Sequence, residues 1–120
     1  MRTSIDFQAV FAQLKKGLKK YEKHCIVDQD TKSEYYLNMP KLDTNGKPIF
    51  FAATGVNKIS VSYYLMPLFR FTDLRETISP ELRTHLHGKS CFRFVKLEPA
   101  LLRELSALTN KCFERCKNEL

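Results

Sequence analysis

The sequence predicts an α+β domain: an antiparallel sheet of about four to five strands with the N- and C-terminal helices packed on one face and two short helices between the last strands. Three observations predict this fold. Amphipathic segments with helical spacing lie at both ends of the chain, alternating apolar and polar residues fill the middle, and Gly, Asn and Pro separate the alternating segments. The 120 residues are 43% hydrophobic, so residues 1–120 are expected to form a single domain with its own core.

The first expected element is an amphipathic helix capped by Thr3 or Ser4. One side of this helix is an apolar stripe made of Phe7, Val10, Phe11, Leu14, Leu18 and Tyr21. The lysines lie off this stripe, at Lys15, Lys16, Lys19, Lys20 and Lys23. We therefore expect the helix to dock through its aromatic side and to turn the lysines toward solvent.

Strands are expected to follow. The run 24–29 predicts an exposed edge strand, and residues 34–39 alternate until Pro40 ends the second strand. In that second strand, Tyr35, Leu37 and Met39 share one face, and Glu34, Tyr36 and Asn38 share the other. The sequence Asp43-Thr44-Asn45-Gly46 is a strong turn signal before the next strand.

Two further strands, 49–56 and 59–66, are predicted to form a hairpin joined at Asn57-Lys58. The first is apolar on both faces around Phe50 to Ala53, which indicates a central strand covered from both sides. The second is expected to place Ile59, Val61, Tyr63 and Leu65 on one face and Ser60, Ser62, Tyr64 and Met66 on the other.

The C-terminal half predicts two short helices, a strand and a long helix. Thr72 is expected to cap the first short helix, and Ser79 the second, which has Pro80 at its start and Gly88 at its end. Residues 91–95 alternate as a strand. Pro99 begins the last helix, whose buried stripe contains Leu101, Leu105, Leu108, Cys112 and Cys116.

Composition narrows the class of protein. The four cysteines form no Cys-x-x-Cys pair, so we expect free thiols and a cytoplasmic location, with Cys112 and Cys116 in the core rather than sharing a metal. Membrane partners are not expected, because no apolar run approaches the ~18 residues of a membrane span and the N-terminus lacks the apolar segment of a signal peptide. The net charge of +7 suits either anionic partners or simple solubility.

Three possible chemical motifs fail on geometry, so no catalytic residue is predicted. Gly88-Lys89-Ser90 lacks the first glycine of a phosphate-binding loop and leads into a strand. His85 and His87 point about 200° apart if they lie on a helix. Cys91 is expected to follow the negative end of a helix, which does not activate a thiol.

A polar surface is the better candidate for function. The expected ligand or partner surface consists of Tyr36, Asn38, Ser60, Ser62, Tyr64, Lys89, Ser90, Cys91 and Arg93. We expect the short helices of residues 72–88 to roof this sheet face as a shallow cleft. The alternative is that these are ordinary solvent-side strand residues.

Five short motifs occur in a fixed order through the middle of the chain. They are Gly46-Lys47, Val61-Ser62, Leu65-Met66-Pro67, Ser79-Pro80-Glu81-Leu82 and Gly88-Lys89-Ser90-Cys91-Phe92. In order and spacing they resemble the YdhG-like bacterial family of unknown function, to which a frataxin-like iron chaperone has been related, and the resemblance spans residues 40–116. It implies a non-catalytic binding or accessory protein that handles iron or iron-sulfur precursors.

Two hypotheses therefore stay open. The iron of the first comes from the resemblance alone, and the first helix carries only Asp6 and Glu22 where frataxin has an acidic ridge. The alternative is an anion-binding module for phosphate or nucleic acid that uses the lysine face, Lys15, Lys16, Lys19, Lys20 and Lys23. The exposed edge strand allows either a monomer or a dimer.

Overall fold

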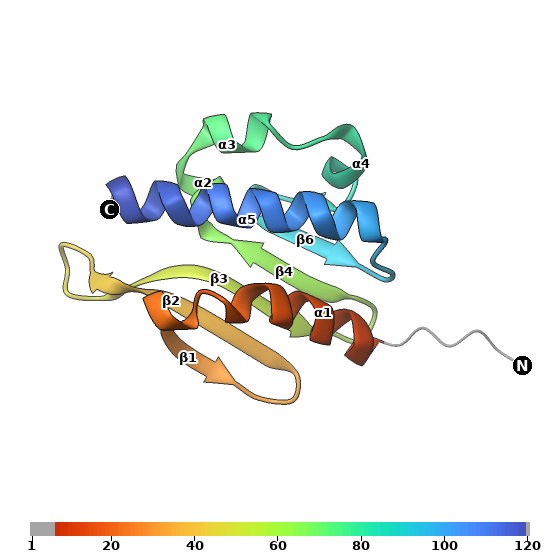
Figure 1. Ribbon diagram of the computed structural model, residues 1–120, viewed down its shortest axis with the longest axis horizontal. Coiled ribbons are helices and arrows are strands. Elements are labelled where there is room, and N and C mark those ends of the chain that lie inside the picture. Colours follow the sequence, from red (N-terminus) through yellow and green to blue (C-terminus); the bar gives the residue numbers. More distant parts are fainter. Residues whose placement is uncertain (1–6, 120) are drawn as a thin grey trace, which may run out of the picture.

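Both long helices lie on the same face of an antiparallel sheet (Figure 1). The computed structural model describes residues 7–119, so the expected cap at Thr3 or Ser4 falls outside the described residues. The helices are α1 (Phe7–Lys19), α2 (Met66–Arg70), α3 (Thr72–Glu76), α4 (Pro80–Arg83) and α5 (Pro99–Glu119), with a 3₁₀ turn η1 (Glu22–His24). The strands are β1 (Ile26–Asp30), β2 (Glu34–Leu42), β3 (Pro48–Val56), β4 (Val61–Leu65), β5 (Leu86–His87) and β6 (Cys91–Phe94).

The six strands follow the order β1-β2-β3-β4-β6-β5, and every neighbouring pair is antiparallel. The predicted α+β class is therefore confirmed, and so is the packing of the N- and C-terminal helices on one face (Figure 1). Hairpin turns join most strands. At the β2–β3 turn, Asp43 Oδ1 accepts hydrogen bonds from the backbone N–H groups of Asn45 and Lys47, and Gly46 adopts a φ of 79°.

The core lies between this sheet and the two long helices. From α1 it receives Phe11, Leu14 and Leu18, all on the predicted apolar stripe and buried. From α5 it receives Leu105, Leu108, Cys112, Phe113 and Cys116. Both cysteines of α5 are fully buried, which confirms their predicted place in the core. The side chains that meet these helices from the sheet include Phe51, Tyr63 and Phe92.

Polar contacts fix α5 to its neighbours. The hydroxyl groups of Tyr63 and Thr109 lie 2.6 Å apart inside the core. Ser79, which caps α4 as predicted, also donates its backbone N–H to Glu104 at 2.8 Å. These contacts hold α4 beside α5, on the helical side of the sheet.

The short helices therefore do not roof the opposite face, contrary to the expectation for residues 72–88. Both α3 and α4 contact α5. Arg115 of α5 also pairs with Asp73 of α3, with Nη1 and Oδ1 3.1 Å apart. The reason is that the buried side chains of these helices, Leu74 and Leu82, join the same core as α5. In addition, Thr72 is the first residue of α3 and its side chain makes no capping hydrogen bond.

The predicted helix before β6 is much shorter than expected. It ends at Arg83, and the chain then forms β5, the sixth strand that the sequence did not indicate. Gly88, with a φ of 72°, makes the turn between β5 and β6 instead of ending a helix. His87 consequently lies on a strand, where it pairs with Cys91.

Strand boundaries differ from the prediction at Pro40 and Ile59. Pro40 does not end β2, because it lies beyond the last residue paired with β1 and inside an irregular register with β3, where a missing N–H is tolerated. Ile59 lies in the β3–β4 turn and is 77% exposed. The turn closes through a hydrogen bond from the N–H of Asn57 to the carbonyl of Ser60, so β4 begins only at Val61.

The central strand β3 is covered on one face, not on both. Leu37 pairs with Ala52 and Asn38 with Phe50, so Phe51 is the extra residue of a β-bulge. The bulge places both Phe51 and Ala52 in the core, whereas Phe50 lies on the opposite face against Tyr36. The apolar run around Phe50 to Ala53, which predicted a strand covered on both faces, is thus explained by a bulge.

Candidate functional site

The candidate site is the face of the sheet opposite the two long helices, which we call the open face. One row of cross-strand partners crosses it from β2 to β6. Tyr36 pairs with Ala53, Ala53 with Tyr64 and Tyr64 with Cys91. Residues that pair directly across antiparallel strands share a face, so these side chains lie side by side.

Three aromatic rings gather on the open face. The ring centroids of Tyr36 and Phe50 are 5.9 Å apart, with an interplanar angle of 37°. Between Tyr36 and Tyr64 lies Ala53, whose side chain is fully buried. Burial raises the pKa of Tyr36, and the negative charge of the nearby Glu34 and the Tyr64 ring hydroxyl raise it further. The open face therefore carries a partly exposed aromatic platform made of Phe50, Tyr36 and Tyr64, with Ala53 beneath it.

A polar row runs beside this platform. Glu34 pairs with Gly55, Gly55 with Ser62 and Ser62 with Arg93, whose side chain is exposed. Asn57 donates a hydrogen bond from Nδ2 to Ser62 Oγ at 2.6 Å. This row gives the platform a cationic edge at Arg93.

The structure brings together most of the side chains that the sequence assigned to this surface. Tyr36, Asn38, Tyr64, Cys91 and Arg93 all lie on the open face. Arg93 is exposed, and the other four side chains are half-buried.

Other predicted surface residues are unsuited to ligand contact. Ser60 is 6% exposed and Ser62 is 2% exposed. Lys89 and Ser90 lie in the β5–β6 turn, where the carbonyl of Ser90 accepts the N–H of Leu65 and Lys89 lies 5.5 Å from the ring centroid of Phe69.

Sequence reasoning missed two members of the open face. Phe50 was assigned to a doubly covered strand, and only the bulge at Phe51 reveals its true direction. His87 was placed on a helix, whereas β5 brings it into line with Cys91. The alternation of apolar residues indicates neither the bulge at Phe51 nor the strand β5.

A second candidate surface is formed by the lysines of α1 and η1. Lys15 points to the sheet, 2.6 Å from Asp30 and 5.3 Å from the ring centroid of Tyr35. The others, at Lys16, Lys19, Lys20 and Lys23, are exposed. A shallow depression of about 530 Å³ is lined by Lys19, Lys20, Glu22 and Lys23.

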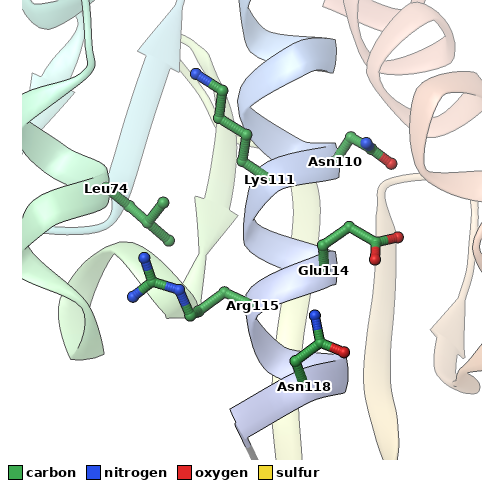
Figure 2. A pocket seen from close by; sticks show the side chains of 6 residues that line it. All are labelled: Leu74, Asn110, Lys111, Glu114, Arg115 and Asn118. Atoms are coloured by element: carbon green, nitrogen blue, oxygen red, sulfur yellow. The ribbon is translucent and has the colours of Figure 1, made fainter.

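Figure 2 shows another depression, of about 410 Å³, along the outer side of α5. Its lining residues are Leu74, Asn110, Lys111, Glu114, Arg115 and Asn118. Their charges are largely engaged within the protein: Arg115 pairs with Asp73 and lowers the pKa of that carboxyl, and Glu114 lies 3.2 Å from Lys117. This arrangement favours a structural contact between α3 and α5.

The described residues contain no group of three His, Cys, Asp or Glu side chains placed to hold a metal ion. His85 stacks on Phe94 with ring centroids 4.8 Å apart, and its Nδ1 lies 3.1 Å from the Arg93 carbonyl oxygen. Burial raises the pKa of the Cys25 thiol to about 11. No helix within the described part of the chain is long and apolar enough to cross a membrane.

Comparison of the chain with protein-family models, with curated proteins and with solved structures gives no match in any of the three.

Proposed function

We propose that the protein is a non-catalytic binding module that takes up a planar, ring-bearing ligand on the open face of its sheet. The observation that carries this proposal is the aromatic platform of Phe50, Tyr36 and Tyr64 on a face that the described helices leave uncovered. A sheet that only had to stay soluble needs no three adjacent rings on its solvent side.

The chemistry of the platform fits a heterocycle such as a nucleobase. Stacking of a base on an aromatic side chain contributes about 1–3 kcal/mol per base and tolerates any base, because every base has a π-face. Asn38 and Arg93 lie at opposite ends of the platform and supply hydrogen-bond donors, and Asn38 supplies an acceptor as well. The ligand would therefore be held mainly by stacking and oriented by polar contacts at its edges.

We also propose that the chain belongs with the YdhG-like bacterial family, and that it works in the cytoplasm. The order of the five motifs from Gly46 to Phe92 supports the family, and four free thiols support a reducing compartment. The resemblance supports a binding role without catalysis. Its iron part rests on the resemblance alone.

A tryptophan placed in the platform tests the proposal directly, since the chain contains no tryptophan. In the Tyr64→Trp variant, titration with adenosine should quench the fluorescence in a saturable manner at millimolar concentration. Adenosine carries no phosphate, so a basic surface elsewhere does not contribute to its binding.

The matched control is Ile59→Trp, which places the same fluorophore at a 77% exposed position in the β3–β4 turn. Its fluorescence should change only through collisions, in proportion to adenosine concentration. Adding Tyr36→Ala to Tyr64→Trp should weaken binding about tenfold, the loss of one stacking contact. Equal, unsaturable quenching of both tryptophans would contradict the proposed function.

A further inference from the structure

We propose that the exposed lysines of α1, of η1 and of the turn between them, namely Lys16, Lys19, Lys20 and Lys23, form a second binding surface for the phosphate backbone of nucleic acid. This inference does not depend on the proposed function. The helix α1 lies on one face of the sheet (Figure 1), and the aromatic platform belongs to the opposite, open face.

The distribution of charge points to this segment. Residues 7–24 contain five lysines and one glutamate, a net +4 out of the +7 of the whole chain. The strand segment 26–66 is neutral by comparison. Its lysines at 32, 41, 47 and 58 are matched by four acidic residues, at 28, 30, 34 and 43. Lys15 is matched by Asp30, so the four exposed lysines and Glu22 leave a net +3 between residues 16 and 23, where a polyanion would meet it as one patch.

The helix arranges these lysines on one side. Lys16 and Lys20 are four residues apart, which places their stems about 6 Å apart along the axis. Lys19 lies between them on the same side, and η1 continues the row to Lys23. The shallow depression lined by Lys19, Lys20, Glu22 and Lys23 is open to solvent, as a backbone phosphate requires.

Two internal contacts sharpen the patch. Lys15 is turned away from it by its ion pair with Asp30. Glu22, the one acidic residue of the segment, accepts a hydrogen bond from the hydroxyl of the fully buried Tyr35, which fixes its carboxylate toward the sheet. Burial and this carboxylate both raise the pKa of Tyr35, so the hydroxyl remains a donor under ordinary conditions. Glu22 lines the same depression as the lysines, but its carboxylate is engaged by the Tyr35 hydroxyl.

Nucleic acid fits this surface better than a membrane does. A basic helix binds a bilayer when its apolar side can enter the headgroup region. In α1 that side is occupied, because Val10, Phe11, Leu14 and Leu18 are buried in the core. The surface offers charge alone, which suits phosphates that stay in water.

The test is the salt dependence of binding to a random-sequence DNA duplex of 15 base pairs, whose bases are stacked and paired. Four lysine–phosphate contacts predict a slope of log K against log salt of about −3.6, so that affinity falls about 150-fold between 50 and 200 mM salt. The variant K16Q/K19Q/K20Q/K23Q should bring the slope close to zero. Glutamine keeps the helix propensity of lysine, and circular dichroism will verify the fold.

The matched control removes the same charge elsewhere. In K47Q/K58Q/K96Q/K111Q the net charge also falls by four. The magnitude of the slope should nevertheless fall by less than about one. If both quadruple variants weaken binding equally, net charge alone acts and the assigned surface is wrong. Absence of duplex binding at 50 mM salt, or binding to phosphatidylserine vesicles but not to DNA, also overturns the proposal.

Discussion

Two pairs of adjacent tyrosines place the same side chain on opposite faces of the sheet. Tyr35 and Tyr63 point to the helices and are almost fully buried, and their hydroxyl groups bond Glu22 and Thr109. Tyr36 and Tyr64 point to the open face and are only partly buried; within the described residues their hydroxyl groups have no hydrogen-bond partner.

The comparison separates architecture from function. On the core face each ring fills a space between helix and sheet, and each polar atom is paired, as burial demands. On the open face the rings have no layer above them, and their polar atoms remain available to a ligand. We therefore expect substitutions on the core face to change stability and those on the open face to change binding.

The largest effect should come from adjacent phenylalanines. Phe51 is fully buried in the bulge, and we expect Phe51→Ala to lower the free energy of unfolding by about 3–5 kcal/mol. The matched variant Phe50→Ala, on the open face, should cost only about 1 kcal/mol. Urea denaturation measures both losses. Similar losses would mean that the open face is covered in solution.

The next effect appears at alkaline pH. Burial, aided by Cys116, raises the pKa of Cys112 from 9.0 to about 12. Above pH 9 the unfolded thiol loses its proton while the folded one keeps it, so the free energy of unfolding falls as pH rises toward 12. We expect Cys112 to contribute a fall of about 1 kcal/mol between pH 8 and pH 10.

Urea denaturation under reducing conditions at pH 7.5, 9 and 10 measures this fall. Cys112→Ala should show a smaller fall over the same range. An unchanged pH dependence in that variant would show that Cys112 titrates normally and is not enclosed by α5 and the sheet.

A smaller effect isolates the hydrogen bond of the core tyrosine. Tyr63→Phe removes a hydroxyl that lies 2.6 Å from Thr109 Oγ1, and it should lower the free energy of unfolding by about 1 kcal/mol. Tyr64→Phe removes a hydroxyl on the open face and should change stability by less than about 0.5 kcal/mol. The order of the two losses is the result to check, again by urea denaturation.

The last expected effect concerns the reactivity of the thiols. Cys91→Ser should change stability least, and its effect is measured as a rate of labelling. Cys91, on the open face, and Cys25 are both partly exposed, whereas Cys112 and Cys116 are buried. Burial raises the pKa of Cys25 to about 11, so little of its reactive thiolate is present at neutral pH. Under native conditions one thiol should react quickly with Ellman's reagent, and Cys91→Ser should abolish this fast phase. Fast labelling of Cys112 or Cys116 instead would show that α5 opens readily from the sheet.

Much of the fold follows from local pattern. The stripe of α1, the start of α5 at Pro99, the cap at Ser79 and the alternation of β2 are all visible in the sequence, because each is set by neighbouring residues. Such features need no knowledge of distant contacts.

The errors share a different cause. The bulge at Phe51 and the strand β5 depend on pairing with residues elsewhere in the chain, and a two-residue strand has no periodicity of its own. The place of the short helices likewise depends on long-range contacts such as Asp73 with Arg115. For this reason the sequence indicated the tyrosines of the open face but not Phe50 beside them.

The edge strand β1 shows how the sheet limits unwanted pairing. It contains an extra residue at Asp28, opposite the register shift between Val27 and Gln29, and Asp30 is held by Lys15. A bulge and charged side chains both discourage addition of another strand at an exposed edge. We therefore expect strand addition to be disfavoured at this edge, where the sequence left a dimer open.

The central claim is that the open face binds a stacked ligand, and amide NMR of the uniformly ¹⁵N-labelled protein during titration with adenosine tests it most directly. The predicted result is a set of saturable shift changes in β2, β3, β4 and β6 around Tyr36, Ala53 and Tyr64, with α1 and α5 unaffected. Shift changes centred on the helices, or none at millimolar adenosine, would contradict the account.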